Sequence, residues 1–222
     1  MLRLMSTLAL AGLLREAAPA LEAALGAPLQ VDLTPTKTLE ARIRAGERAS
    51  AAVLTAEAIA ALSAEGILDG MTARPLAHSR VGLAVKAGAP HPDISTVEAL
   101  RRMLLEVPSL CYSRAGASGI FFAGLIERLG VAEVVNAKAI VIPQGFTAEK
   151  VVSGEAAIAF QQISELMEVP GIEVVGPLPE GAQTVAVFSG AAFLGAEPRV
   201  LDAVTRACTP AALAARGLEA VV

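Results

Sequence analysis

Short runs of apolar residues alternate along this chain with longer amphipathic segments. The runs predict strands, and the segments, whose apolar positions recur every three or four residues, predict helices. Several helical segments end at a glycine, which favours a helix C-terminus. The predicted strands are 2–6, 29–33, 51–55, 81–86, 109–113, 137–142, 156–161, 172–175 and 184–190. The predicted helices are 9–25, 39–45, 56–64, 96–105, 120–129, 148–153, 164–167, 199–208 and 210–216.

This alternation predicts an α/β fold with mainly parallel sheets that helices cover on both faces. Ligands of such sheets bind outside the carboxyl ends of the strands. The segments that follow the predicted strands are rich in hydroxyls, amides and glycine. They are Ser6–Thr7, Thr34–Thr38, Arg114–Gly119, Pro143–Thr147 and Gln161–Gln162. These segments are therefore the predicted ligand contacts.

The stretch SLCYSRAGASGIFFAGLIERLG, residues 109–130, predicts a strand, a glycine-rich turn and a helix. Gly116 and Gly119 allow close approach of the backbone to a bound group, and Ser118 lies where an N-cap hydroxyl is expected. The first N–H groups of a helix have no internal partner, and the helix dipole is positive at that end. The stretch therefore predicts an anion site. The structural alternative is an ordinary turn with a helix cap.

Composition narrows the class of protein. The chain has 222 residues, of which 54% are hydrophobic and 18% charged, so it can bury a large core. Its net charge of −4 and the absence of a Lys/Arg run argue against nucleic acid as a partner. Cys111 and Cys208 lack the spacing of metal ligands, and Cys111 is predicted to be a buried free thiol. No phosphate-binding glycine motif and no catalytic triad spacing is present, so no cofactor is predicted.

The amino terminus, MLRLMSTLALAGLL, has the basic start and apolar run of a short signal peptide. Ser6 and Thr7 interrupt the run, which then continues into a helical pattern without a cleavage site. The segment is better interpreted as the first strand of the fold. This interpretation predicts a cytoplasmic protein, unless the sequence is the mature form of a periplasmic one.

The order of the segments resembles the type II periplasmic-binding-protein fold, closest to the molybdate-binding-protein-like branch of ABC transporter receptors. The resemblance covers almost the whole chain. It is carried by TPTKTLEARIRAGERASAAVLTAEAIAAL, ARPLAHSRVGLAVKAGAPHPDISTVEAL, YSRAGASGIFFAGLIERLG and VVSGEAAIAFQQISEL. The resemblance implies two lobes around a central cleft, with residues 1–77 plus 183–222 in lobe one and 78–182 in lobe two.

Three positions depart from the pattern of molybdate receptors. Ala9 replaces the serine of the first loop and leaves Thr7 as the nearby hydroxyl. Thr36 and Lys37 match a pair of small hydroxyl residues, so a cation enters the second loop. Gln161 and Gln162 replace a tyrosine. Because neutral donors hold the oxyanion in that family, the lysine favours an organic carboxylate.

The main functional interpretation is a monomeric substrate-binding protein that closes its lobes around a small anion and can serve an ABC permease. The predicted ligand contacts are Ser6, Thr7, Thr36, Lys37, Ser118, Gly119, Gly145, Gln161 and Gln162. The alternative is a cofactor-independent isomerase of a small di- or tricarboxylate, because some relatives of this branch resemble an aconitate isomerase. In that case Lys37 or another titratable group transfers a proton. A binding protein leaves its ligand unchanged, which separates the two.

Overall fold

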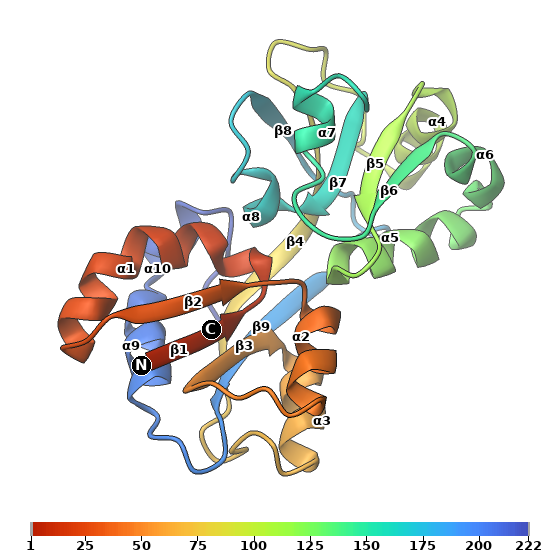
Figure 1. Ribbon diagram of the computed structural model, residues 1–222. Helices are drawn as coiled ribbons and strands as arrows, with labels where there is room; N and C mark the ends of the chain where they lie inside the picture. Colours follow the sequence, from red (N-terminus) through yellow and green to blue (C-terminus); the bar gives the residue numbers. More distant parts are fainter. Residues whose placement is uncertain (1, 222) are drawn as a thin grey trace. The chain divides into compact units, whose positions relative to one another are not determined.

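The computed structural model describes residues 2–221 (Figure 1). It divides into two compact units, unit 1 with the residues up to 79 and from 186 onward, and unit 2 with residues 80–185. The chain passes from unit 1 to unit 2 within strand β4 (Arg74–Lys86) and returns near the start of β9 (Val185–Ala192). The predicted lobes were 1–77 plus 183–222 and 78–182, so both structural crossings come slightly later in the chain.

Unit 1 is a three-layer α/β structure whose strand order is β2-β1-β3-β9. Strands β1 (Leu2–Ser6), β2 (Leu29–Leu33) and β3 (Ala51–Thr55) are parallel, and β9 is antiparallel to β3. Successive residues of β1 face opposite layers, as the two-residue period of a strand requires. Leu4 packs in the core beneath α1 (Ala11–Leu25), α9 (Arg199–Ala207) and α10 (Pro210–Ala214). Met5 packs beneath α2 (Thr36–Arg44) and α3 (Ala56–Ala64) on the other side (Figure 1).

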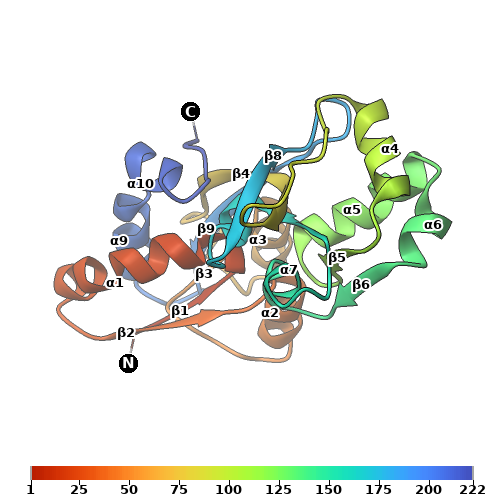
Figure 2. The same ribbon diagram turned by 90° about the horizontal axis from the view of Figure 1, so that it is seen from above.

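Unit 2 repeats this layering with the strand order β4-β7-β5-β6. Strands β5 (Leu110–Ser113), β6 (Ala139–Ile142) and β7 (Ile158–Gln162) are parallel, whereas β4 pairs antiparallel with β7 and with β8 (Ile172–Pro177). One face carries α4 (Val97–Glu106), α5 (Ala117–Arg128) and α6 (Ala132–Asn136), which Figure 2 shows grouped together. The other face carries α7 (Glu149–Val152) and α8 (Ile163–Leu166).

The predicted fold class is confirmed, since the chain forms a mixed, largely parallel α/β structure. Strands 2–6, 29–33 and 51–55 and helix 56–64 are found with the predicted bounds. The start of β4 was predicted seven residues too late, because Pro75 and the polar residues around it obscure the strand pattern. Helix α6 and the 3-10 turn Leu8–Leu10 were not predicted as separate elements. Within residues 2–221, no helix is both long enough and apolar enough to cross a membrane.

Two helices that carry predicted ligand contacts begin earlier than expected. Helix α2 was predicted from residue 39 and begins at Thr36, and α5 was predicted from residue 120 and begins at Ala117. Threonine and glycine have low helix propensity, which is why the sequence assigned both starts to loops. The N-cap residues are Pro35 and Gly116, and neither has a side-chain hydroxyl. Predicted contacts in both segments therefore lie in first helical turns.

Candidate functional site

Each unit has one edge at which its parallel strands end in polar residues. In unit 2 this edge, called here the unit 2 edge, consists of Ser113 at the end of β5, the first turn of α5, the loop 145–147, Gln161–Gln162 at the end of β7 and the first turn of α8. In unit 1 the corresponding unit 1 edge consists of Ser6–Thr7 after β1 and Thr36–Lys37 at the start of α2. The two edges are described separately.

Two serine hydroxyls at the unit 2 edge are buried without using their hydrogen-bonding capacity. Ser113 and Ser118 are 2% and 1% exposed, and neither Oγ has a hydrogen-bond partner within residues 2–221. Ser118 is the second residue of α5, not its N-cap as predicted, because Gly116 holds that position. In the first turn the N–H groups of Gly119 and Ile120 both donate to the carbonyl oxygen of Gly116 at 3.1 Å, so only those of Ala117 and Ser118 can add to the donors of this edge. A buried hydroxyl without a partner costs about 1–3 kcal/mol, so the arrangement favours a ligand that supplies acceptors.

The two glycines of this turn have separate roles. A Cβ at residue 119 would lie 1.6 Å from the carbonyl oxygen of Ser113, so Gly119 is required for α5 to pack against the end of β5. The predicted reason, close approach to a ligand, is not needed to explain this glycine. A Cβ at residue 116 would lie 2.7 Å from the Oγ of Ser113 and 3.9 Å from the Oγ of Ser118. Gly116 therefore leaves open the space beside both unpartnered hydroxyls.

Gln162 lies on the same face of the sheet as Ser118. Phe160 of β7 stacks on Phe122 of α5 with ring centroids 4.2 Å apart. Gln162 lies two residues after Phe160 on β7, and Ser118 lies about one helical turn before Phe122 on α5. Because α5 runs antiparallel to β7, both steps, of about 6 Å each, lead from the stacked rings in the same direction. Gln162 is 1% exposed, and neither amide atom has a hydrogen-bond partner within the described residues. A third unsatisfied polar group thus lies on the α5 face of the sheet, at about the same level as Ser118.

Gln161, in contrast, is fully occupied. Its Oε1 accepts hydrogen bonds from the backbone N–H and the Oγ1 of Thr147, at 2.8 and 2.9 Å. Its Nε2 donates to the carbonyl oxygen of Gly145 at 2.9 Å. Gly145 has φ +102°, a left-handed conformation that favours glycine. Gln161 and Gly145 therefore fix the loop 145–147 on the end of β7, and of the two predicted glutamines only Gln162 has free hydrogen-bonding capacity.

A buried glutamate follows the glutamine pair. Glu165, on α8, is 5% exposed and accepts hydrogen bonds from the side chain of Gln161 and the backbone of Gln162. Burial raises the pKa of Glu165 to about 8, although both hydrogen bonds act in the opposite direction. Ser164 beside it is also buried, and its Oγ has no partner within residues 2–221. The unit 2 edge thus contains a carboxyl group that is largely neutral at pH 7.

The unit 1 edge has less unused hydrogen-bonding capacity. The Oγ of Ser6 donates to the carbonyl oxygen of Thr7 at 3.1 Å, and the N–H of Thr7 donates to the carbonyl oxygen of Val53 at 2.9 Å. Thr36 is 5% exposed, and its Oγ1 has no partner within the described residues. Among the predicted contacts in unit 1, Thr36 therefore most resembles Ser118 and Gln162.

Lys37 has a carboxylate partner on its own helix. Its Nζ lies 2.9 Å from Oε2 of Glu40, one turn further along α2, and its side chain is 62% exposed. Glu40 is buried and also lies 3.4 Å from Nη1 of Arg44. The structure thus gives Lys37 a role in neutralising a buried carboxylate, and its direct contact with a ligand stays a prediction.

Comparison with known proteins now identifies the family. A family model described as bacterial extracellular solute-binding protein matches residues 2–203. The chain belongs to this family. It is 34% identical over 196 residues to an aconitate isomerase from a Pseudomonas species, with 86% of this chain and 74% of that protein covered.

Solved structures of this solute-binding family's fold agree with the architecture. The Azotobacter vinelandii periplasmic molybdate-binding protein has a TM-score of 0.80 at 14% identity, with both chains fully covered. PEB3 with bound L-phospholactate has a TM-score of 0.74 at 13% identity, also over both full chains. Peb3 from Campylobacter jejuni has a TM-score of 0.72 at 11% identity, again with full coverage of both chains. At these identities the likeness shows the fold alone, and it confirms the predicted resemblance to the type II periplasmic-binding-protein fold.

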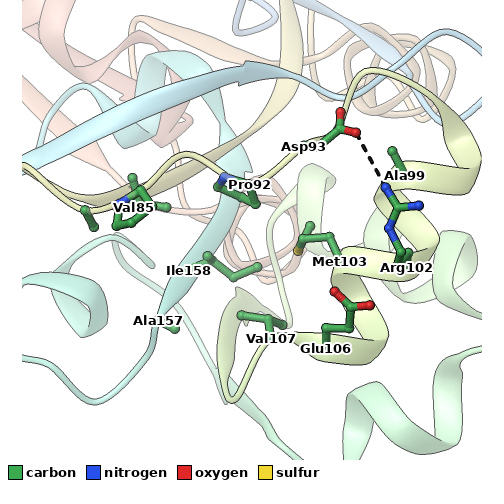
Figure 3. Close-up of a pocket in the computed structure, with 12 residues that line it drawn as sticks. Val85, Pro92, Asp93, Ala99, Arg102, Met103, Glu106, Val107, Ala157 and Ile158 are labelled. Carbon is green, nitrogen blue, oxygen red and sulfur yellow. Dashed lines mark ion pairs between the residues drawn. The ribbon is translucent and has the colours of Figure 1, made fainter.

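A cavity of about 570 Å³ in unit 2 of this solute-binding protein does not coincide with the polar edge (Figure 3). Its lining is mostly apolar and includes Ile158, the first residue of β7, whereas Gln162 is the last. The polar groups at its rim are an ion pair of Asp93 and Arg102, 3.6 Å apart, and Glu106. The cavity thus lies at the opposite end of β7 from the unpartnered donors, and we do not assign the anion to it.

Both cysteines are free, and burial raises the pKa of Cys111 to about 12 and that of Cys208 to about 11. The prediction of a buried free thiol at Cys111 is confirmed. Among residues 2–221, no group of three His, Cys, Asp or Glu side chains is arranged to hold a metal ion.

Sequence reasoning missed Ser113, Ser164 and Glu165 of this solute-binding protein. Ser113 was counted as a strand residue, and nothing in the pattern distinguishes its hydroxyl from a satisfied one. Glu165 did leave a signal. Gln162 is the N-cap of α8 and Glu165 is the third helical residue, the spacing at which a glutamate bonds back to the N-cap N–H.

Proposed function

We propose that this protein binds a small di- or tricarboxylate and isomerises it without a cofactor. The observation that carries the proposal is the set of buried groups with unused hydrogen-bonding capacity at the unit 2 edge, Ser113, Ser118 and Gln162. Hydroxyls and an amide N–H₂ can donate to carboxylate oxygens, and donor bonds to a charged acceptor are stronger than neutral ones. In unit 1, Thr36 is a buried hydroxyl of the same kind, also without a partner within residues 2–221.

The similarity to an aconitate isomerase supports the choice of substrate class and of an enzyme over a passive receptor. Aconitate is an unsaturated tricarboxylate, and moving its double bond requires only that a proton leave one carbon and return to another. Such a step needs a titratable group and no redox partner. The Lys37–Glu40 pair favours a titratable group other than Lys37 for this role, because that lysine is already paired with a carboxylate.

Incubation of the protein with trans-aconitate, followed by proton NMR, tests the proposal. Conversion to the cis isomer is expected, and calorimetry is expected to show weaker binding for Ser118→Ala and Gln162→Leu by about 1–2 kcal/mol each, the scale of a hydrogen bond to a charged group. Ser153→Ala, in an exposed position of unit 2, is the matched control and leaves the affinity unchanged. Failure of any di- or tricarboxylate to bind would contradict the proposal.

A second candidate is a receptor that captures the carboxylate and leaves it unchanged, and membership of the solute-binding family favours it. Tight binding without conversion in the same NMR experiment would support this candidate. Closure of the two predicted lobes and delivery to an ABC permease stay predictions in that case. A ligand-dependent decrease of the radius of gyration in solution scattering tests the closure.

A further inference from the structure

The unit 2 edge contains a carboxyl group, that of Glu165, in addition to its hydrogen-bond donors. Glu165 is buried between the side chain of Gln161 and the backbone of Gln162, and it follows Ser164, whose buried hydroxyl has no partner within residues 2–221. Gln162, also unpartnered, directly precedes α8. A carboxyl group is thus built into the part of the molecule where unsatisfied groups are most concentrated.

We propose that Glu165 is the proton-transfer residue of the isomerisation, acting across the end of β7 on a carboxylate that Ser118 and the amide of Gln162 hold from the α5 side. This inference rests on the proposed function. Three features of its position support this role. Glu165 accepts a hydrogen bond from the N–H of Gln162, and through the side chain of Gln161 it is connected to the loop 145–147. Two buried residues near it in the chain, Gln162 and Ser164, have side chains without partners within residues 2–221. Fixed geometry of this kind holds a base at one distance from a bound substrate.

The surroundings of Glu165 give its carboxyl group a pKa near neutral pH. Burial raises its pKa to about 8, and no charged group contributes to the shift. The titratable or charged side chains on the elements around α8 are exposed, half-buried or neutral. They are Cys111 of β5, Glu149 and Lys150 of α7, Glu173 of β8, Arg74, His78, Arg80 and Lys86 of β4, and Glu168 just after α8. Lys150 pairs with Glu155, and Glu173 pairs with His91. A protonated Glu165 also adds no negative charge beside an anionic ligand.

The proposed step is balanced without a co-reactant. The ionised carboxylate of Glu165 takes a proton from the methylene carbon next to the double bond; a C–H bond breaks and an O–H bond forms. The electron pair spreads over the allylic carbons into a substrate carboxylate, which neutral donors stabilise. The carboxylic acid then returns the proton to the other end of the allylic unit, and the double bond moves. No electrons are gained or lost, and the base is regenerated.

The alternative is that Glu165 only caps α8, as glutamates at this spacing do. A glutamine could still accept a hydrogen bond from the N–H of Gln162 but could not transfer a proton. The variant Glu165→Gln therefore separates the two roles. Glu149→Gln is the matched control, because Glu149 is an exposed carboxyl on neighbouring helix α7 of the same unit.

The experiment uses the full chain with trans-aconitate in heavy water and follows both isomerisation and deuterium uptake into the methylene group by NMR. Calorimetry measures binding in parallel. Glu165→Gln is expected to lower both rates by roughly 10²–10⁴-fold, the range of general acid–base catalysis, with a dissociation constant within about threefold of wild type, because the donors are intact. Glu149→Gln keeps both rates. The wild-type rate is expected to rise with pH and level off above about pH 8.

Other outcomes separate this proposal from the proposed function. If the wild type isomerises aconitate and Glu165→Gln does so at a similar rate, Glu165 is a capping residue and only this proposal is overturned. If the wild type binds aconitate but neither exchanges protons nor converts it, the isomerase and the role of Glu165 are both overturned. If Glu165→Gln does not fold, Glu165→Asp replaces it: a folded Asp variant with unchanged rate and pH profile overturns the proposal, since a carboxyl displaced by one methylene loses its position.

Discussion

Glu40 in unit 1 and Glu165 in unit 2 are buried to the same extent, each 5% exposed, but their surroundings are opposite. Glu40 lies 2.9 Å from the ammonium of Lys37 and 3.4 Å from the guanidinium of Arg44. Glu165 is held by an amide and a backbone N–H, and its pKa is raised to about 8. Equal burial therefore goes with different surroundings: Glu40 has two cations beside it, and the shift of Glu165 has no charged group among its causes.

The same contrast extends to the two polar edges. The hydroxyl of Ser6 and the N–H of Thr7 in unit 1 have protein partners, and Thr36 has the unpartnered hydroxyl. At the unit 2 edge, Ser113, Ser118, Gln162 and Ser164 have none within residues 2–221. Polar groups in native interiors are almost always hydrogen-bonded, so a concentration of exceptions is informative. The unit 2 edge is the stronger candidate for recognition of the ligand.

The largest expected effect concerns the pH dependence of folding stability, and it depends on Glu165. An unfolded glutamate titrates near pH 4.3, whereas burial raises the pKa of Glu165 in the folded protein to about 8. The contribution of Glu165 to the free energy of unfolding is fully present below the unfolded pKa. It decreases as pH rises from there towards 8, by at most about 1.4 kcal/mol per pH unit, because only the unfolded state loses its proton in this range. Glu165→Gln removes this titration and is expected to flatten the profile between pH 5 and 8.

Urea denaturation at pH 5 and pH 8.5 measures this effect. Glu149→Gln serves as the control and should follow the wild-type profile, because its carboxyl is exposed. Parallel profiles for wild type and Glu165→Gln would show that Glu165 titrates like an exposed carboxyl. The contrast between the two buried glutamates would then disappear.

A smaller effect separates the two glutamines of the unit 2 edge. Gln161→Ala leaves the buried N–H of Thr147 and the carbonyl of Gly145 without their partner and should destabilise the protein by about 2–3 kcal/mol. Gln162→Leu removes an amide whose two polar atoms have no partner within the described residues, so stability should stay the same or rise by up to about 1 kcal/mol. Urea denaturation of both variants checks this. Equal destabilisation by the two substitutions would mean that Gln162 has a structural role.

The sequence was sufficient for the fold because the fold depends on periodicity. Apolar runs such as 51–55, with Ala56–Ala64 after them, define strand and helix without reference to the rest of the chain. The resemblance of four segments to periplasmic binding proteins then predicted the family, and the family model that matches residues 2–203 confirms it.

The site was only partly predictable, because hydrogen-bond partners are a property of the packed structure. Gln161 and Gln162 are adjacent and identical in sequence, yet the two-residue period of β7 turns one towards the loop 145–147 and the other towards α5. The Lys37–Glu40 pair was visible in the sequence, since residues three apart are neighbours on a helix. For Glu165 the sequence shows only the three-residue spacing from Gln162 that is typical of a helix cap. Its burial could not be predicted, because it depends on the packing of α8 against β7 and β8.

The smallest expected effect concerns the buried glutamate that has cations beside it, Glu40, and its ion pair with Lys37. Lys37→Met removes the nearer cation from a buried carboxylate and should cost about 1–2 kcal/mol of stability. The loss is limited because Arg44 still lies 3.4 Å from Glu40, and because a lysine near a helix N-terminus is itself unfavourable by a few tenths of a kcal/mol. Glu40→Gln removes the buried charge and leaves two cations that water can solvate, so its cost should be lower, about 0.5–1 kcal/mol. In a double-mutant cycle, Lys37→Met should therefore have little effect on stability in the Glu40→Gln background.

Melting temperatures with trans-aconitate and with molybdate, measured on the same variants, then decide whether the lysine also contacts the ligand. If Lys37→Met abolishes a preference for the carboxylate while Glu40→Gln strengthens it, Lys37 binds the ligand directly. If both variants keep the wild-type preference, Lys37 serves only Glu40, and recognition of the anion depends on the neutral donors.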